Sequence, residues 1–140
     1  MNFSRRLFGF IYLVGAIANV AMILLTPEIY REFADQALIP FYRNSWNSLV
    51  IPNLYVFVSL TIAFEVGLGL LFLRGRRFLG LAYLVSLGFN IGLIPFGWTF
   101  FYSNGVLVLV QLYLIANVAN SRQFGFIGEK SGLSRAQARR

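Results

Sequence analysis

One acidic residue stands inside a long apolar segment, and it is the strongest candidate for chemistry in this chain. Glu65 lies nine positions before Arg74 in a run of apolar residues. A carboxylate in hydrocarbon costs at least ~2.5 kcal/mol, so such residues usually face the interior of a helix bundle and have a partner there. Three amides, Asn19, Asn90 and Gln111, occupy comparable positions in the other apolar segments. Counting 1.5 Å per residue from the nearest arginine puts these four residues about 13 to 20 Å from one membrane surface.

This spacing predicts a polar layer near the middle of the membrane, to which each of four helices contributes one residue. Thr61 and Gly69 lie one turn either side of Glu65 and leave room on that face. Three interpretations stay open. The layer is a hydrogen-bonded clamp between helices, a binding site for a small amphipathic molecule such as a quinone head or a lipid, or a protonatable site for coupled transport.

Two tyrosines join the candidate set through an internal repeat. With a shift of 71 residues, the segment 5–19 lies over 76–90, and seven of the fifteen positions are identical. Tyr12, Gly15 and Asn19 then correspond to Tyr83, Ser86 and Asn90. Their spacing of three and four residues puts each set on one helix face. The repeat predicts two helical hairpins related by an axis along the membrane normal, with these faces toward the bundle axis.

Several kinds of chemistry are excluded by composition. The chain has no cysteine and no histidine. Thiolate nucleophiles, disulfides, iron–sulfur ligation and His-ligated zinc or haem are therefore ruled out. We expect no catalytic residue, no metal site and no intrinsic cofactor, which favours a non-enzymatic role for the chain on its own and leaves enzyme activity open.

The elements that must position these residues are four apolar segments, at about 7–25, 49–73, 78–98 and 103–119. Hydrophobic residues make up 58% of the chain and charged residues 12%, which is far from the composition of a soluble domain. A spanning helix needs about 20 mainly apolar residues. The sequence thus predicts an all-α membrane protein, in which residues 1–120 form a four-transmembrane-helix bundle of two hairpin repeats.

The basic residues predict the orientation of this bundle. Ten lie before the first segment, between the second and third, or after the fourth, whereas only Arg31 and Arg43 lie on the other side. The positive-inside rule therefore predicts that both termini are cytoplasmic, in a cell inner membrane. Residues 121–140 are predicted to form a basic cytoplasmic tail. Trp46 and Trp98 fall at the outer interface, where an aromatic belt is expected.

A short amphipathic helix is expected between the first two spans. Thr26, Pro27 and Glu28 form a favourable helix start, and apolar residues then recur at helical spacing as far as Leu38. The segment of about 27–38 is therefore predicted to lie on the outer membrane surface. A lid that covers the bundle is the alternative for the same segment.

The segment 64–77, FEVGLGLLFLRGRR, resembles the signature of DoxX-like membrane proteins. In that group a Glu near the middle of the second helix precedes a Gly/Leu-rich run and a short Gly/Arg turn, and Glu65 matches this position. The Thr26-Pro27-Glu28 start and the four-span layout are similar too. The resemblance implies a membrane protein that acts with partners, since some relatives are described as subunits of quinone-linked oxidoreductases or of oxidative-stress complexes. Thiol-based roles do not carry over, because this chain has no cysteine.

We therefore expect a DoxX-like inner-membrane protein with an accessory or small-ligand-binding role around Glu65, with a quinone as the candidate cofactor. A membrane subunit of a quinone-linked oxidoreductase and a proton-coupled small transporter are the alternatives. The lipid bilayer is the expected partner, a protein partner and a homo-oligomer stay open, and nucleic acid is not expected despite the net charge of +7. The candidate residues are Glu65, Asn19, Asn90, Gln111, Thr61, Tyr12 and Tyr83.

Overall fold

The computed structural model describes residues 2–74 and 76–120, and this part of the chain is helical with no strand. Its long helices are α1 (Asn2–Leu25), α4 (Leu54–Leu73), α5 (Leu79–Leu93) and α6 (Trp98–Asn120). Four helical stretches are long and apolar enough to cross a membrane, which indicates a membrane protein and confirms the predicted helical class. They are Phe3–Leu25, Pro40–Leu73, Leu79–Phe96 and Trp98–Asn117.

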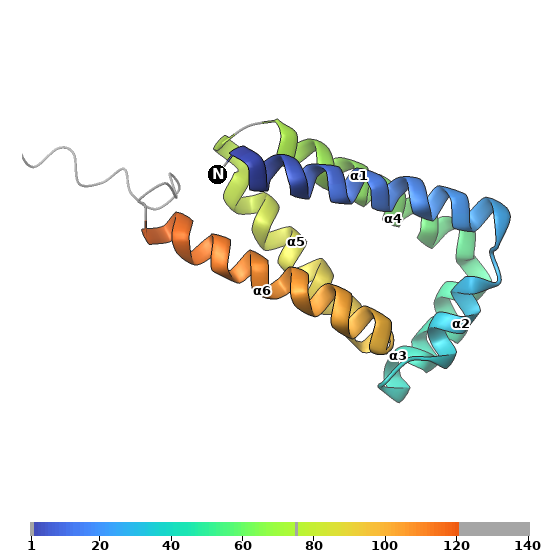
Figure 1. The fold of residues 1–140 in the computed structure, drawn as a ribbon. Helices are drawn as coiled ribbons and strands as arrows, with labels where there is room; N and C mark the ends of the chain where they lie inside the picture. The colour runs from blue at the N-terminus through green and yellow to red at the C-terminus, as the bar shows by residue number, and fades with distance from the viewer. Residues whose placement is uncertain (1, 75, 121–140) are drawn as a thin grey trace, which may run out of the picture.

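The long helices form two antiparallel pairs (Figure 1). Helices α1 and α4 lie side by side along their length, and α5 and α6 make the second pair. The pairs meet near the turn between α4 and α5 and diverge toward the other end, like the arms of a V. The short helices α2 (Ile29–Asp35) and α3 (Pro40–Ser45) close the wide end.

Two glycines let α1 and α4 approach closely. A Cβ atom on Gly9 would lie 3.2 Å from the carbonyl oxygen of Gly69, and a Cβ on Gly69 would lie 3.0 Å from the carbonyl oxygen of Gly9. Leu13 and Leu73 fill the space beside the glycines, since their side-chain atoms lie 2.9 Å from the same Cβ positions. Small residues at such a crossing allow the backbone contact that drives helix association in lipid.

Two prolines shape the wide end of the V. Pro52 has no N–H and its ring crowds the carbonyl four residues earlier, so the helix that begins at Pro40 widens into a π turn at Trp46–Val50 and tightens into a 3₁₀ turn at Ile51–Asn53 before α4. Pro95 lies in the 3₁₀ turn Ile94–Phe96, which ends α5. The third span predicted at 78–98 is therefore broken before Gly97, whose φ of 127° turns the chain into α6.

The predicted surface segment at 27–38 is shorter in the structure. Helix α2 covers only Ile29–Asp35, and its buried residues Tyr30 and Ala34 face the bundle. The chain then turns, and the amide of Leu38 donates to the carbonyl of Pro95 at 2.8 Å. This hydrogen bond ties the end of the α2 segment to the turn between α5 and α6.

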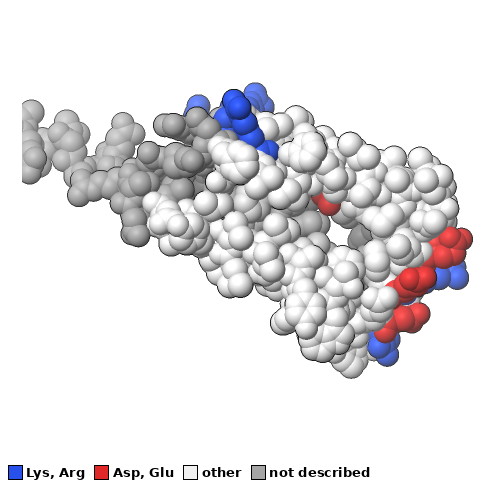
Figure 2. Space-filling view, viewed as in Figure 1, with Lys and Arg blue, Asp and Glu red and all other residues white. Residues whose placement is uncertain are grey.

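Two of the long helices begin earlier in the sequence than predicted. Helix α6 begins at Trp98 rather than near residue 103, and α1 begins at Asn2 rather than near residue 7. The predicted basic tail, residues 121–140, lies outside the described residues. Basic side chains gather near the narrow end of the V, whereas acidic and basic side chains mix over α2 and α3 (Figure 2). The surface between them is uncharged except for acidic atoms beside a hollow. An uncharged band between two charged ends is typical of a surface that contacts lipid.

Candidate functional site

The predicted polar residues form two separate hydrogen-bonded networks. Asn19, Tyr30 and Glu65 make up the first, which we call the cavity network. Tyr12, Ser86, Asn90 and Gln111 make up the second, which we call the junction network because it joins α1, α5 and α6. The single layer expected from the sequence is therefore divided, and no hydrogen bond within the described residues connects the two networks.

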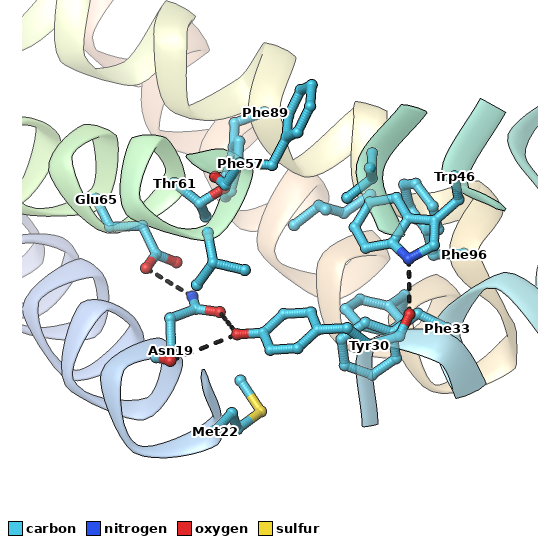
Figure 3. Close-up of a pocket in the computed structure, with 14 residues that line it drawn as sticks. Asn19, Met22, Tyr30, Phe33, Trp46, Phe57, Thr61, Glu65, Phe89 and Phe96 are labelled. Carbon is cyan, nitrogen blue, oxygen red and sulfur yellow. Dashed lines mark hydrogen bonds between the residues drawn. The ribbon is translucent and has the colours of Figure 1, made fainter. Parts of the chain in front are cut away.

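In the cavity network, Asn19 is the central residue (Figure 3). Its amide nitrogen donates to Oε2 of Glu65 at 2.8 Å, so that α1 and α4 are linked. Its amide oxygen accepts from the hydroxyl of Tyr30 at 2.8 Å, which connects α2 to the same group. The carboxylate fits against α1 because residue 15 is glycine, where a Cβ would lie 2.9 Å from Oε1 of Glu65.

Trp46 holds Tyr30 in place from the other side. Its indole N–H donates to the backbone carbonyl of Tyr30 at 2.6 Å. Burial, followed by the negative charge of Glu65, raises the pKa of Tyr30 above its usual 10.0. The hydroxyl therefore stays protonated at neutral pH and keeps donating to Asn19.

A cavity of about 340 Å³ lies between the two arms of the V, beside this network. Figure 2 shows a hollow in the same region, between the α1–α4 and α5–α6 arms, with acidic colour at its edge. The volume falls in the range of small-molecule sites, which are mostly apolar with a few polar groups. The lining follows this pattern: it consists of Asn19, Met22, Tyr30, Phe33, Trp46, Val50, Phe57, Val58, Thr61, Glu65, Phe89, Leu93, Phe96 and Phe100.

Glu65 is the only charged residue among the described residues that line this cavity. It is 7% exposed, and Oε1 accepts no hydrogen bond from the part of the chain that the structure describes. Thr61 also lines the cavity, but its hydroxyl donates to the carbonyl of Phe57 at 3.0 Å, one turn earlier in α4. The polar end of the cavity thus offers mainly hydrogen-bond acceptors.

The junction network is buried and does not line the cavity. The hydroxyls of Tyr12 and Ser86 lie 2.5 Å apart, and the amide of Asn90 donates to the Tyr12 hydroxyl at 2.9 Å. Gln111 donates to Ser86 from α6, while its Oε1 is buried without a partner among residues 2–74 and 76–120. This arrangement fits the clamp interpretation, because its hydrogen bonds link three helices.

The seven candidate residues therefore have different surroundings. Asn19, Thr61 and Glu65 line the cavity, whereas Tyr12, Asn90 and Gln111 belong to the junction network. Tyr83 joins neither. Its ring packs edge-on against Phe8 and Phe72, with centroids 5.6 and 5.1 Å away, in the apolar core near the narrow end of the V.

Sequence reasoning missed the aromatic part of the site. Trp46 was assigned to an aromatic belt, but in the structure it is partly buried and lies 4.7 Å from Phe96, measured between ring centroids. Phe33 likewise packs against Phe100 at 5.0 Å. The signal in the sequence was the density of aromatic residues at positions 41–46 and 96–102, which follow Pro40 and Pro95. Their inward direction depends on how α2 and α3 fold back, which periodicity does not show.

Comparison with family models, with curated proteins and with solved structures found no significant match. Within the described residues, no group of three or more Asp or Glu side chains is arranged so that it could hold a metal ion. The function is therefore inferred from the geometry of the cavity.

Proposed function

We propose that this chain is a membrane protein that binds one small amphipathic molecule, with its polar head at Glu65 and its apolar part among the aromatic side chains. The observation that carries this proposal is the cavity of about 340 Å³ with a single buried carboxylate at its polar end. Intramembrane acids usually face a partner or a pathway, and Oε1 of Glu65 has no partner in the described chain. A quinone head or a lipid is the candidate ligand from the sequence.

A transport role has less support in this geometry. The junction network closes the narrow end of the V with hydrogen bonds among Tyr12, Ser86, Asn90 and Gln111. A ligand in the cavity would therefore face a packed region on that side. The proposal is for a binding or accessory protein rather than an enzyme, which would need a partner chain or a bound cofactor.

The membrane setting is part of the proposal. The positive-inside rule favours cytoplasmic termini in a cell inner membrane, with α2 at the outer surface. Helix α2 has the pattern expected of an interfacial helix, since Arg31, Glu32 and Asp35 are exposed and Tyr30 and Ala34 are buried. In this arrangement α2 is a lid over the outer end of the cavity. Its residues Tyr30 and Phe33 form part of the cavity lining.

The family and the repeat are proposed on sequence grounds. The Glu65 segment and the four-span layout favour a DoxX-like protein. The two-hairpin repeat gains support from one correspondence: Gly15 packs against Glu65 of α4, and its counterpart Ser86 accepts from Gln111 of α6. Each first helix thus contacts a polar residue of the second helix of its own hairpin.

The test is mass spectrometry of small molecules released from gently purified protein, with wild type compared with Glu65→Gln and Glu65→Leu. We expect an amphipathic molecule that is enriched in wild type and lost in the Leu variant. Glu32→Gln is the matched control, because Glu32 is an exposed acid on α2 and its loss should leave the bound molecule in place. Absence of any enriched molecule from correctly folded wild type would reject the proposal.

A further inference from the structure

The polar end of the cavity discriminates between kinds of ligand head, because its hydrogen bonds run in one direction. Tyr30 donates to Asn19, and Asn19 donates to Glu65. The Thr61 hydroxyl uses its proton on a backbone carbonyl. The atoms left facing the cavity are therefore chiefly acceptors, and a head that donates hydrogen bonds suits them better than a head that only accepts.

The carboxylate also lacks a partner of opposite charge. No Lys or Arg lines the cavity, and no ion pair to Glu65 occurs within the described residues. A buried carboxylate keeps its charge when a cation or several hydrogen bonds compensate it, and otherwise takes up a proton. Here the chain supplies only one hydrogen bond, from Asn19. A positively charged ligand head would supply what is missing.

The lining suits a cation as well. Six Phe or Trp side chains line the cavity, and aromatic rings attract a cation that lies over a ring face. An apolar lining also lowers the local dielectric constant, which strengthens the attraction between a carboxylate and a cation. The six aromatic residues are Phe33, Trp46, Phe57, Phe89, Phe96 and Phe100.

We infer that the cavity selects lipophilic ammonium ions, in which a cationic, hydrogen-bond-donating head contacts Oε1 of Glu65 and an apolar body lies among the aromatic rings. This inference rests on the proposed function, because it names the ligand class of the same site. A ligand with a neutral head of the same size should bind less tightly, and a ligand with an anionic head should bind least tightly.

The experiment uses the fluorescence of Trp46 as a reporter. The chain has two tryptophans, and Trp98 is 63% exposed, so Trp98→Phe leaves the cavity residue as the only source of signal. The Trp98→Phe variant, purified in detergent, is titrated at pH 7 with 4-phenylbutylamine, 4-phenylbutanol and 4-phenylbutyrate. The amine and the alcohol share one phenylbutyl body and differ in the charge of the head, and the butyrate carries an anionic head on a chain of the same carbon number.

We expect the amine to bind at least about tenfold more tightly than the alcohol, since hydrogen bonds to charged groups are about twice as strong as neutral ones. Glu65→Gln should remove this preference, and Glu32→Gln should keep it. Partition of a probe into detergent affects its apparent affinity for every variant equally, so it cancels when the affinities of one probe for two variants are compared.

Equal binding of amine and alcohol to the wild-type cavity would overturn the ammonium inference and leave the proposed function standing. A preference for the amine that survives Glu65→Gln would overturn it too. If none of the three probes changes the Trp46 signal, the proposed function fails together with the inference. The ratio of the amine affinity to the alcohol affinity, measured in protein that keeps Glu65, tests the ammonium inference even if the Glu65→Gln variant does not fold.

Discussion

At the scale of single residues, Asn19 determines what Glu65 can do. Its amide is shared between Glu65 and Tyr30, and its orientation is fixed because each of its two polar atoms has a partner. Glu65 is thereby held with one oxygen bonded and one free. A carboxylate restrained in this way is preorganised for a ligand and loses little freedom on binding.

The hydrogen bond from Tyr30 can be tested by removing one hydroxyl. Tyr30→Phe should destabilise the protein by about 0.6 kcal/mol, the average for such bonds in membrane proteins. Unfolding in mixed micelles of increasing SDS content measures this difference. Tyr113→Phe is the control, because Tyr113 is 68% exposed and should have no effect. Equal stability of the two variants would mean that the Tyr30 bond contributes nothing.

At the scale of elements, α1 and α4 cross in close contact at Gly9 and Gly69. This crossing aligns Asn19 with Glu65, because both lie farther along the same pair of helices. Any widening of this crossing would also separate the amide from the carboxylate. Packing at one end of the pair therefore controls the geometry of the site.

Gly69→Ala is predicted to destabilise the protein by about 1 to 3 kcal/mol, because the added methyl group would meet Leu13 and the Gly9 carbonyl. Gly67→Ala is the matched control two residues earlier in α4, where a Cβ has no neighbour within 4 Å. It should be neutral or stabilise by up to about 1 kcal/mol. The same SDS titration compares the two variants, and an equal effect would contradict the close crossing.

The sequence was most informative where a residue type is energetically unfavourable inside a membrane. Glu65 could be found because an acid in an apolar helix requires an explanation, and the helical class follows from four apolar segments. The polar residues predicted to form a single layer make two separate hydrogen-bonded networks in the structure. The α5–α6 arm diverges from α1–α4, so Asn90 meets Tyr12 rather than its counterpart Asn19. The positions of Tyr30 and Trp46 in the cavity lining were not predicted, because short-helix packing at the wide end decides the direction of these side chains.

At the scale of the whole molecule, the V shape explains why there is a cavity. Two tightly paired arms meet at one end, where the junction network and the aromatic core fill the space. They separate at the other end, where α2 and α3 close the opening. The cavity is what remains between a packed end and a lid, and Glu65 lies at its polar side.

The proposed orientation predicts that both ends of the chain lie in the cytoplasm and that α2 lies outside. A green fluorescent protein fused after Arg140 should fluoresce, and alkaline phosphatase fused after Leu38 should be active, in a bacterial host. Alkaline phosphatase fused after Arg140 should be inactive, and green fluorescent protein fused after Leu38 should not fluoresce. The opposite pattern would show that the basic residues do not set the orientation.

The central claim is that Thr61 and Glu65 face a cavity that a small amphipathic molecule occupies, and single cysteines test it most directly because the chain has none of its own. Thr61→Cys places a thiol in the cavity lining, whereas Ala63→Cys places one on the exposed face of the same helix. A thiol reacts as its thiolate, which requires a polar environment. With delipidated protein, we predict that a small methanethiosulfonate labels the Thr61→Cys variant faster than the Ala63→Cys variant, and that a membrane lipid extract slows only the labelling at position 61. Equal rates at the two positions, or no protection by the extract, would contradict the account.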